Sequence, residues 1–245
     1  MIARFRYGDR VFNGNVDGER IVSDGVSYEL QDVKLLPPSV PTKVVCVGLN
    51  YVEHARELKM ELPDEPIIFL KPPSAVVGHN DDIILPERSK RVDYEGELAV
   101  VISRRCRGIS AEDADDYILG YTCFNDVTAR DLQQKDGQWT RSKSFDTFAP
   151  VGPWVAQMSV EDAEELDICT RVNGETRQRS NTSDLIFGIG ELVEFVSSIM
   201  TLEPGDIIAT GTPPGVGRLE KGDIVEVEIY GIGVLRNRAV SATPT

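Results

Sequence analysis

The sequence contains few of the residues that form disulfides or bind soft metal ions. Its 245 residues include four cysteines and two histidines. The cysteines are widely spaced without any C-x-x-C pair, which indicates neither a zinc site nor a disulfide framework. They are Cys46, Cys106, Cys123 and Cys169. Because His54 and His79 are the only imidazoles, any metal site must be built mainly from oxygen ligands.

Basic charge and long apolar runs are also scarce. The chain has 26 Lys and Arg against 40 Asp and Glu, which leaves a net charge of −14 at pH 7. This balance argues against nucleic acids and anionic membranes as partners, since both are polyanions. No stretch is long and apolar enough to span a bilayer, and no apolar run follows the first residues as in a signal peptide. We therefore expect a cytoplasmic protein, whose acidity suits either a salt-rich cytoplasm or an ordinary one.

The beginning of the chain predicts a separate small unit. Its first forty residues contain short β-rich runs, with a hairpin turn expected at Asn13-Gly14. Prolines cluster between 37 and 41 and indicate a boundary. We predict a small N-terminal β domain at 1–41 and a catalytic domain at 42–245.

The rest of the chain predicts many strands and few helices. β-branched runs such as 96–103 and 223–231 are typical of strands. Helical patterns cover 50–60, 111–118 and 182–200, and Thr182 or Ser183 is the expected cap of the last one. This balance favours a β-rich mixed α/β fold over a doubly wound one.

Three carboxylates suggest a site for a hard cation. In D-Y-E-G-E-L-A-V-V at 93–101, Glu95 and Glu97 are two residues apart and would lie on one face of a strand. Asp126 ends the apolar run GYTCFN. A solvent-facing strand and a helix N-cap are the commoner explanations of each motif alone. Three acidic groups together, however, suit Mg²⁺ or Mn²⁺, which can chelate a 2-oxo or enol acid.

A second group of candidate catalytic residues lies in N-Y-V-E-H-A-R-E at 50–57. His54 and Glu57 are three residues apart, so on a helix they would be within hydrogen-bonding reach. A carboxylate that fixes an imidazole makes it a base able to activate water, although a surface histidine beside a glutamate is the commoner cause of this spacing. Lys143 on its own would be a surface lysine. The glycine-rich stretch 209–217 and FGIGEL at 187–192 lack the spacing of nucleotide-binding loops.

Taken together, these segments resemble the fumarylacetoacetate hydrolase family over residues 42–240. The segments that carry the resemblance are VGLNYVEHARE, PIIFLKPPSAVVG, VDYEGELAVVI, GYTCFNDVTARDLQ, WTRSKSFDTFAPVGPW, VNGETRQ and GDIIATGTPPGVG. Short members act as acylpyruvate hydrolases, oxaloacetate decarboxylases, or hydroxymuconate isomerases and decarboxylases. The resemblance implies a β-roll of mixed sheets with few helices, a small N-terminal domain and a homodimer.

The resemblance also implies a role for each site residue. Glu95, Glu97 and Asp126 would bind Mg²⁺ or Mn²⁺, with Ca²⁺ as a substitute in crystals. His54 and Glu57 would activate water, and Lys143 would meet the developing negative charge. Arg130 and Gln133 would line the pocket, and Thr212 would hold the substrate carboxylate. Leu49 departs from the pattern, because acylpyruvase-like members often carry an arginine there to bind a second substrate charge.

The resemblance thus favours a metal-dependent enzyme that acts on a small oxo-acid through an enolate. Hydrolysis of a C–C bond in an acylpyruvate, similar to fumarylacetoacetate and typical of aromatic catabolism, is the first expectation. The alternatives are an isomerase or decarboxylase of 2-hydroxyhepta-2,4-diene-1,7-dioate or 5-carboxymethyl-2-hydroxymuconate, or an oxaloacetate decarboxylase. All share one electron sink, the enolate. A non-catalytic divalent-ion module is the remaining alternative, but it would leave the His54–Glu57 pair without a purpose.

Overall fold

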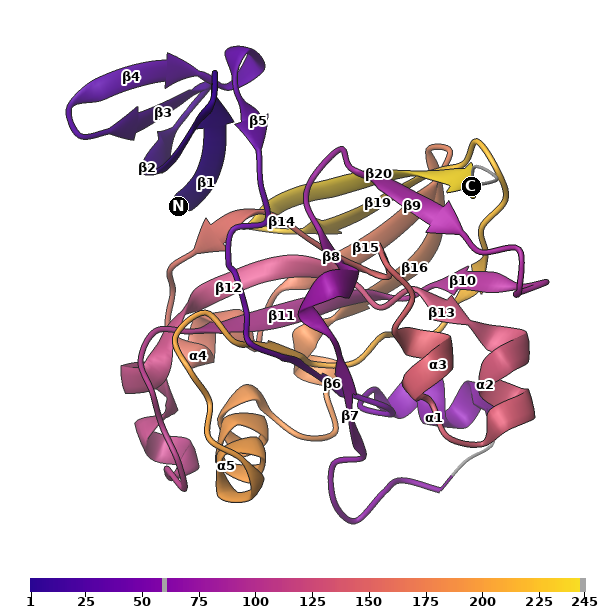
Figure 1. Cartoon of the computed structure of the whole chain (residues 1–245). Coiled ribbons are helices and arrows are strands. Elements are labelled where there is room, and N and C mark those ends of the chain that lie inside the picture. Colours follow the sequence, from indigo (N-terminus) through magenta and orange to yellow (C-terminus); the bar gives the residue numbers. More distant parts are fainter. Residues whose placement is uncertain (59–60, 243–245) are drawn as a thin grey trace.

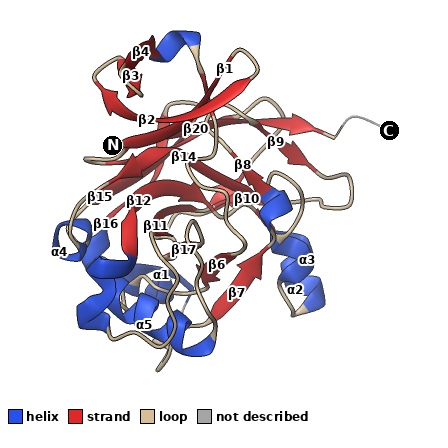
Figure 2. Ribbon diagram, turned by 60° about the vertical axis from the view of Figure 1, so that its left-hand side comes forward, coloured by secondary structure: helices blue, strands red, loops and turns tan. Residues whose placement is uncertain are grey.

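The computed structural model describes residues 1–58 and 61–242 (Figure 1). Strands arranged in three sheets dominate it, and the α-helices lie at the end of the molecule opposite the N-terminal strands (Figure 2). Both parallel and antiparallel pairs occur within the sheets. The predicted β-rich mixed fold with few helices is confirmed.

The largest sheet has twelve strands, more than the other two sheets together. Its main path runs β4-β3-β2-β1-β14-β12-β11-β17-β6-β7, while β5 pairs with β1 and β8 with β14. The bounds are β1 Ile2–Tyr7, β2 Arg10–Asp17, β3 Arg20–Ser23, β4 Val26–Glu29, β5 Lys34–Leu35, β6 Val44–Val47, β7 Ile68–Lys71, β8 Val76–Val77, β11 Gly96–Ile102, β12 Ile118–Asn125, β14 Ala149–Ala156 and β17 Ile207–Ala209. The strands β11 and β12 lie at its centre and are almost entirely buried.

Two smaller sheets complete the fold. One has five strands in the order β16-β15-β19-β20-β9, and the other has three in the order β13-β10-β18. The bounds are β9 Asp82–Leu85, β10 Val92–Tyr94, β13 Thr128–Ala129, β15 Asp167–Val172, β16 Glu175–Asn181, β18 Gly217–Arg218, β19 Ile224–Ile229 and β20 Gly233–Ser241. Leu98 and Val100 of β11 share one apolar core with Ile168 of β15 and Val227 of β19. The central strands of the large sheet therefore pack against the five-stranded sheet.

The α-helices are short. They are α1 Val52–Leu58, α2 Arg130–Asp136, α3 Thr140–Lys143, α4 Val160–Ala163 and α5 Ile189–Ile199. The 3₁₀ helices are η1 Leu30–Asp32, η2 Pro73–Ala75, η3 Ala111–Tyr117 and η4 Thr182–Asp184. The helix predicted at 50–60 corresponds to α1. The last two residues of the predicted range, 59 and 60, lie outside the described part of the chain. No helix within residues 1–58 and 61–242 is long and apolar enough to cross a bilayer.

The prediction of one helix over 182–200 is wrong in its first half. η4 occupies only 182–184, and the long helix α5 begins after Gly188. The intervening backbone bonds to Asn50: the Ile186 amide donates to its carbonyl at 2.9 Å and the Phe187 amide to its side-chain oxygen at 2.8 Å. These long-range contacts hold the segment out of helical geometry. Likewise, the helical pattern at 111–118 forms the 3₁₀ helix η3 instead of an α-helix.

The N-terminal strands form their own small cluster. Ala3, Phe5 and Ile21 make its buried core, against which Trp154 of β14 packs. The predicted turn at Asn13-Gly14 is wrong, because both residues lie inside β2. The turns come at Gly8 and Gly18, whose φ angles of 57° and 58° suit glycine. β1 also pairs with β14 at Ile2↔Val155, so the cluster continues the large sheet. The domain boundary at 41 stays a prediction.

Gly96 lies where β11 packs closely against β15. A Cβ atom on Gly96 would lie 2.0 Å from the Thr170 hydroxyl. We expect Gly96→Ala to lower the free energy of unfolding by about 1–3 kcal/mol, as overpacked cores do, in urea denaturation. The Thr170 hydroxyl has no hydrogen-bond partner among the described residues, so Thr170→Ala should cost little alone and restore part of the loss in the double variant. A Gly96→Ala variant as stable as the wild type would contradict this packing.

Candidate functional site

Three carboxylates from separate positions in the chain meet inside the protein. Glu95 lies between β10 and β11, Glu97 lies in β11, and Asp126 directly follows β12. Because β11 and β12 run antiparallel with Gly96 opposite Asn125, the start of one strand lies beside the end of the other. One oxygen of each group lies within 4.8 Å of the others, and all three side chains are buried. The structure thus brings the three predicted metal ligands together.

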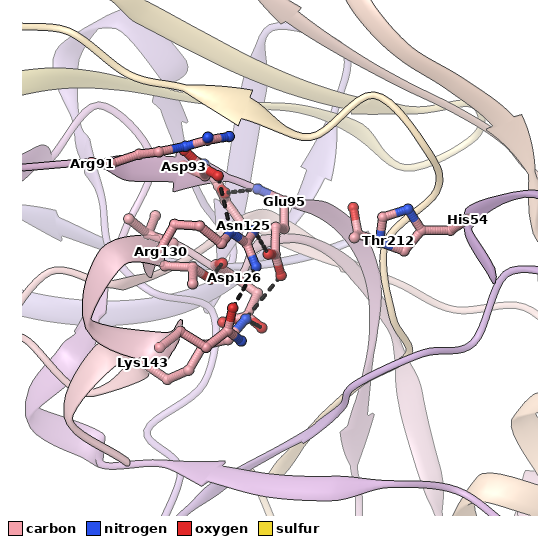
Figure 3. A network of polar contacts seen from close by, with 12 residues as sticks. His54, Arg91, Asp93, Glu95, Asn125, Asp126, Arg130, Lys143 and Thr212 are labelled. Carbon is pink, nitrogen blue, oxygen red and sulfur yellow. Dashed lines mark hydrogen bonds and ion pairs between the residues drawn. The ribbon is translucent and has the colours of Figure 1, made fainter. Parts of the chain in front are cut away.

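Cationic side chains surround two of these carboxylates (Figure 3). The Lys143 ammonium group donates to Glu95 Oε2 at 2.9 Å and to Asp126 Oδ2 at 2.5 Å. The Lys71 ammonium group pairs with the other oxygen of Asp126 and donates to the Val127 carbonyl at 3.0 Å. Arg130 pairs with Glu95 Oε1. Lys143, which looked like a surface lysine in isolation, is only 2% exposed at the end of α3.

Glu97 has a different environment from its two neighbours. No Lys or Arg among residues 1–58 and 61–242 forms an ion pair with it, and its Oε2 accepts a hydrogen bond from the Gly211 amide at 3.0 Å. Burial, Asp126 and Glu95 raise the pKa of Glu97 well above its usual value. For Glu95, burial acts in the same direction, but Lys143 and Arg130 outweigh it and lower its pKa to about 2. The cluster therefore has one carboxylate that a further cation would neutralise.

The donor set fits a hard divalent ion. Carboxylate oxygens converging in a buried site are the ligands that Mg²⁺, Mn²⁺ and Ca²⁺ prefer, and the repulsion between them decreases when a cation binds. Lys143 stays positively charged beside these carboxylates. Burial lowers its pKa, but Asp126 and Glu95 raise the pKa overall, so the ammonium form is favoured. The site thus combines a cation-binding cluster with a fixed positive charge beside it.

The candidate base lies on α1. His54 Nδ1 lies 3.0 Å from Glu57 Oε2, with the His54 side chain 8% exposed and the Glu57 side chain 46% exposed. Asn50, just before α1, donates through Nδ2 to the Thr210 carbonyl at 2.8 Å. This bond ties α1 to the turn that contains Gly211 and Thr212. Figure 3 shows His54 and Thr212 on the other side of Glu95 from Lys143.

The expected substrate-binding residues already have protein partners. The Thr212 hydroxyl donates to the Gly96 carbonyl at 2.9 Å and accepts from Gln178 Nε2 at 2.8 Å. Arg130 Nη1 donates to Gln133 Oε1 at 2.7 Å, so these two residues lie together at the start of α2. Thr212 is therefore bound to the backbone between Glu95 and Glu97, next to the cluster.

Two buried charged residues were not predicted from the sequence. Lys71 ends the apolar run IIFL at 67–70, and a lysine at the end of such a run could have signalled a buried partner. Asp93 precedes Glu95 with the same two-residue spacing that joins Glu95 to Glu97. It is fully buried and accepts hydrogen bonds from Arg91 and Arg130. The distant arginine partner, which only the fold supplies, makes its burial tolerable.

Comparisons with known proteins give a consistent result. Residues 43–240 match the family model described as fumarylacetoacetate (FAA) hydrolase C-terminal. The structure of 5-carboxymethyl-2-hydroxymuconate delta-isomerase from Mycobacterium smegmatis superposes with a TM-score of 0.93, at 45% identity over 99% of both chains. The mitochondrial oxaloacetate tautomerase FAHD2A of Bos taurus is 51% identical over 216 residues, 84% of this chain and 69% of that protein. Maleylpyruvate hydrolase from Sphingobium sp. SYK-6, in complex with manganese(II) and pyruvate, superposes with a TM-score of 0.85, at 32% identity over 99% of both chains.

The unequal environments of Glu95 and Glu97 predict opposite effects of the same substitution. The pKa of Glu97 is raised in the folded protein, so protonation of Glu97 stabilises the fold at low pH. This stabilisation is lost as the pH rises through the raised pKa. Because the pKa of Glu95 is lowered to about 2, its ion pairs stabilise the fold above the usual pKa of about 4.3 and are lost as the pH falls toward 2.

At pH 7 we therefore expect Glu97→Gln to raise the melting temperature of EDTA-treated protein and Glu95→Gln to lower it. Thermal unfolding followed by circular dichroism between pH 4 and pH 8 measures both effects. The advantage of Glu97→Gln over the wild type should grow as the pH rises. A Glu97→Gln variant less stable than the wild type across this range would contradict the lack of a cationic partner for Glu97 among the described residues.

Proposed function

The chain belongs to the fumarylacetoacetate hydrolase family, and we propose that it is a divalent-metal-dependent enzyme that interconverts the keto and enol forms of a small 2-oxo dicarboxylic acid such as oxaloacetate. The observation that carries this proposal is the buried cluster of Glu95, Glu97 and Asp126, in which one carboxylate has no cationic partner among the described residues. A paired histidine lies on the adjoining helix. Members of this family are enzymes, and this cluster is where we place the chemistry.

Glu95, Glu97 and Asp126 would hold Mg²⁺ or Mn²⁺. When bound, such an ion acts as a Lewis acid on the 2-oxo group and lowers the cost of an enolate. The manganese and pyruvate bound by the Sphingobium hydrolase support this assignment. Lys143, whose ammonium form is favoured, places a positive charge beside the same site, where it would offset the negative charge that develops on the substrate oxygen.

His54 would move the proton. Its Nδ1 faces Glu57, which favours the tautomer with the hydrogen on Nδ1 and leaves the lone pair of Nε2 to accept a proton. The proton would leave carbon 3 of the substrate to Nε2, and the imidazolium would then return a proton to the oxygen on carbon 2, which gives the enol and restores neutral His54. No bond between heavy atoms breaks, so the reaction needs no water or second substrate. The burial of His54 would limit exchange of this proton with solvent.

The relatives support proton transfer ahead of C–C hydrolysis, which the sequence alone placed first. A tautomerase is 51% identical and an isomerase 45% identical, whereas two hydrolases of known structure are 36% and 32% identical. Leu49 is 4% exposed and offers no charge for a second substrate carboxylate, whether of an acylpyruvate or of oxaloacetate, so it does not separate the two candidates. Hydrolysis remains the second candidate, because the His54–Glu57 pair could instead activate a water. A decarboxylase would use the same enolate.

The expected homodimer, cytoplasmic location and role in aromatic catabolism stay predictions. The homodimer can be tested by sedimentation at micromolar concentration. A non-catalytic divalent-ion module also stays an alternative, and the activity measurements below would favour it if no substrate reacts.

Divalent ions should stabilise the protein. We expect Mg²⁺ or Mn²⁺ to raise the melting temperature of EDTA-treated protein and oxalate, an enolate mimic, to raise it further, since a ligand at 100 times its Kd adds about 2.7 kcal/mol. Asp126→Asn should abolish both shifts. Asp206→Asn, which alters a buried carboxylate bonded to Lys43 and Thr42, should keep them. No shift in the wild type would refute the metal site.

The reaction can be tested with the two histidines of the chain. We expect His54→Ala to slow oxaloacetate enol–keto conversion by about 10²–10⁴-fold, the usual contribution of a general base, while Mn²⁺ affinity is kept. His79→Ala is the matched control, because His79 Nδ1 accepts from the Arg236 amide at 3.2 Å and has no contact with the cluster. The ultraviolet absorbance of the enol follows the rate.

The same variants separate the candidate reactions on a panel of oxaloacetate, acylpyruvates and hydroxymuconates. If His54→Ala abolishes C–C hydrolysis of an acylpyruvate but leaves tautomerisation intact, His54 is a water activator and the second candidate function replaces the first.

A further inference from the structure

A fourth buried carboxylate, Asp93, lies outside the cluster but is connected to it (Figure 3). We propose that Asp93 is a positioning residue that fixes the Arg130 guanidinium and, through it, sets the orientation of Glu95 and how strongly Arg130 attracts it. The inference rests on the proposed metal centre and adds to it a residue that contacts neither the three carboxylates nor the substrate. Asp93 would thereby set the affinity of the site for its divalent ion.

Asp93 is held at both ends by arginines. Its Oδ1 accepts from Arg91 Nε at 2.9 Å and its Oδ2 from Arg130 Nε at 2.9 Å. The backbone around it is fixed as well, because β10 pairs with β13 and with β18 at this residue. The Arg130 amide also donates to the Arg91 carbonyl at 2.8 Å. A buried carboxylate with both oxygens engaged on a paired strand has one position available.

Arg130 transmits this constraint to Glu95. Its planar guanidinium bonds through three different nitrogens: Nε to Asp93, Nη1 to Gln133 at 2.7 Å and Nη2 to Glu95 Oε1. Three contacts in one plane fix the orientation of the group, which a lysine could not do. Since Glu95 Oε2 accepts from Lys143 at 2.9 Å, both oxygens of Glu95 are fixed. The direction of this metal-site carboxylate thus depends on the plane of Arg130.

The charge of Asp93 matters as much as its geometry. Arg130 lies between two carboxylates, so Asp93 shares its positive charge with Glu95. If Asp93 were neutral, Arg130 would interact more strongly with Glu95 and compete with the divalent ion for it. Outer groups that orient metal-binding side chains typically change affinity by about 10–100-fold.

The test is the Mn²⁺ affinity of Asp93→Asn, measured by isothermal titration calorimetry on the full chain. We expect the Kd to rise about 10–100-fold. The tautomerisation rate should fall at limiting Mn²⁺ and recover as Mn²⁺ is raised, because the catalytic groups stay in place. Wild-type affinity in Asp93→Asn would overturn the inference alone. No Mn²⁺ binding by the wild type would overturn the proposed metal centre and the inference with it.

Asp206→Asn is the matched control for a general loss of stability. Asp206 is equally buried and also pairs with a cation, Lys43, but it lies at the far end of β11, where its carbonyl accepts from the Ile102 amide at 2.9 Å. Asp206→Asn should lower the melting temperature without changing the Mn²⁺ affinity. If it weakens Mn²⁺ binding as much as Asp93→Asn does, the effect is structural and the inference fails.

A double-variant cycle tests whether Asp93 acts through Arg130. Asp93→Asn should change the Mn²⁺ affinity strongly in the wild type and little in Arg130→Gln, because the connection is already broken. Additive losses would overturn the proposed route. Should Asp93→Asn fail to fold, Arg91→Gln alters the half-exposed outer partner of Asp93 instead. A changed Mn²⁺ affinity in Arg91→Gln would then support the inference, and an unchanged one would overturn it.

Discussion

The repulsion among buried carboxylates is the constraint on which the rest of this structure depends. Glu95, Glu97 and Asp126 bring oxygens within 4.8 Å of one another where little water can screen them. Lys71, Lys143 and Arg130 offset most of that repulsion through ion pairs with Glu95 and Asp126. The repulsion that remains falls on Glu97, which is where a divalent ion would contribute most.

The fold supplies this arrangement through the ends of its strands. The chain leaves the small sheet after β10 and enters the large sheet at β11, so Glu95 lies at the break between them. The turn after β17 brings the Gly211 amide to Glu97. Gly211 has a φ of 102°, and a Cβ there would lie 2.8 Å from Asn50 Cβ. A glycine is therefore needed where the turn, α1 and β11 meet.

The proposed function separates two tasks between two kinds of structure. Ion binding is assigned to strand ends in the core, where paired backbones hold the carboxylates rigidly. Proton transfer is assigned to His54 on a short helix, whose partner Glu57 is about half exposed. A shared ion site with a separately placed base is consistent with relatives that bear the names of a hydrolase, an isomerase and a tautomerase. In such a site the position of the base relative to the enolate decides which reaction follows.

Local patterns in the sequence determined the β-rich class, the alternation of Glu95 with Glu97 and the three-residue spacing of His54 and Glu57, because each depends on neighbours along the chain. Where local signals were misleading, distant contacts had overridden them. Asn13-Gly14 has the composition of a turn but lies inside β2, where it pairs with β1. Residues 185–188 have a helical pattern, but bonds to Asn50 hold them out of helical geometry.

Only the tertiary structure decided which charges meet. Lys71 and Asp126 are 55 residues apart, and Glu97 and Gly211 are 114 apart. The sequence around Lys143 and Asp93 gave no sign that they are buried, because a lysine or aspartate is expected to be exposed unless the fold supplies a buried partner. The sequence by itself could therefore name the carboxylates. Their ionisation and their partners depend on distances that only the packed sheets define, and so does the lack of a cationic partner for Glu97 among the described residues.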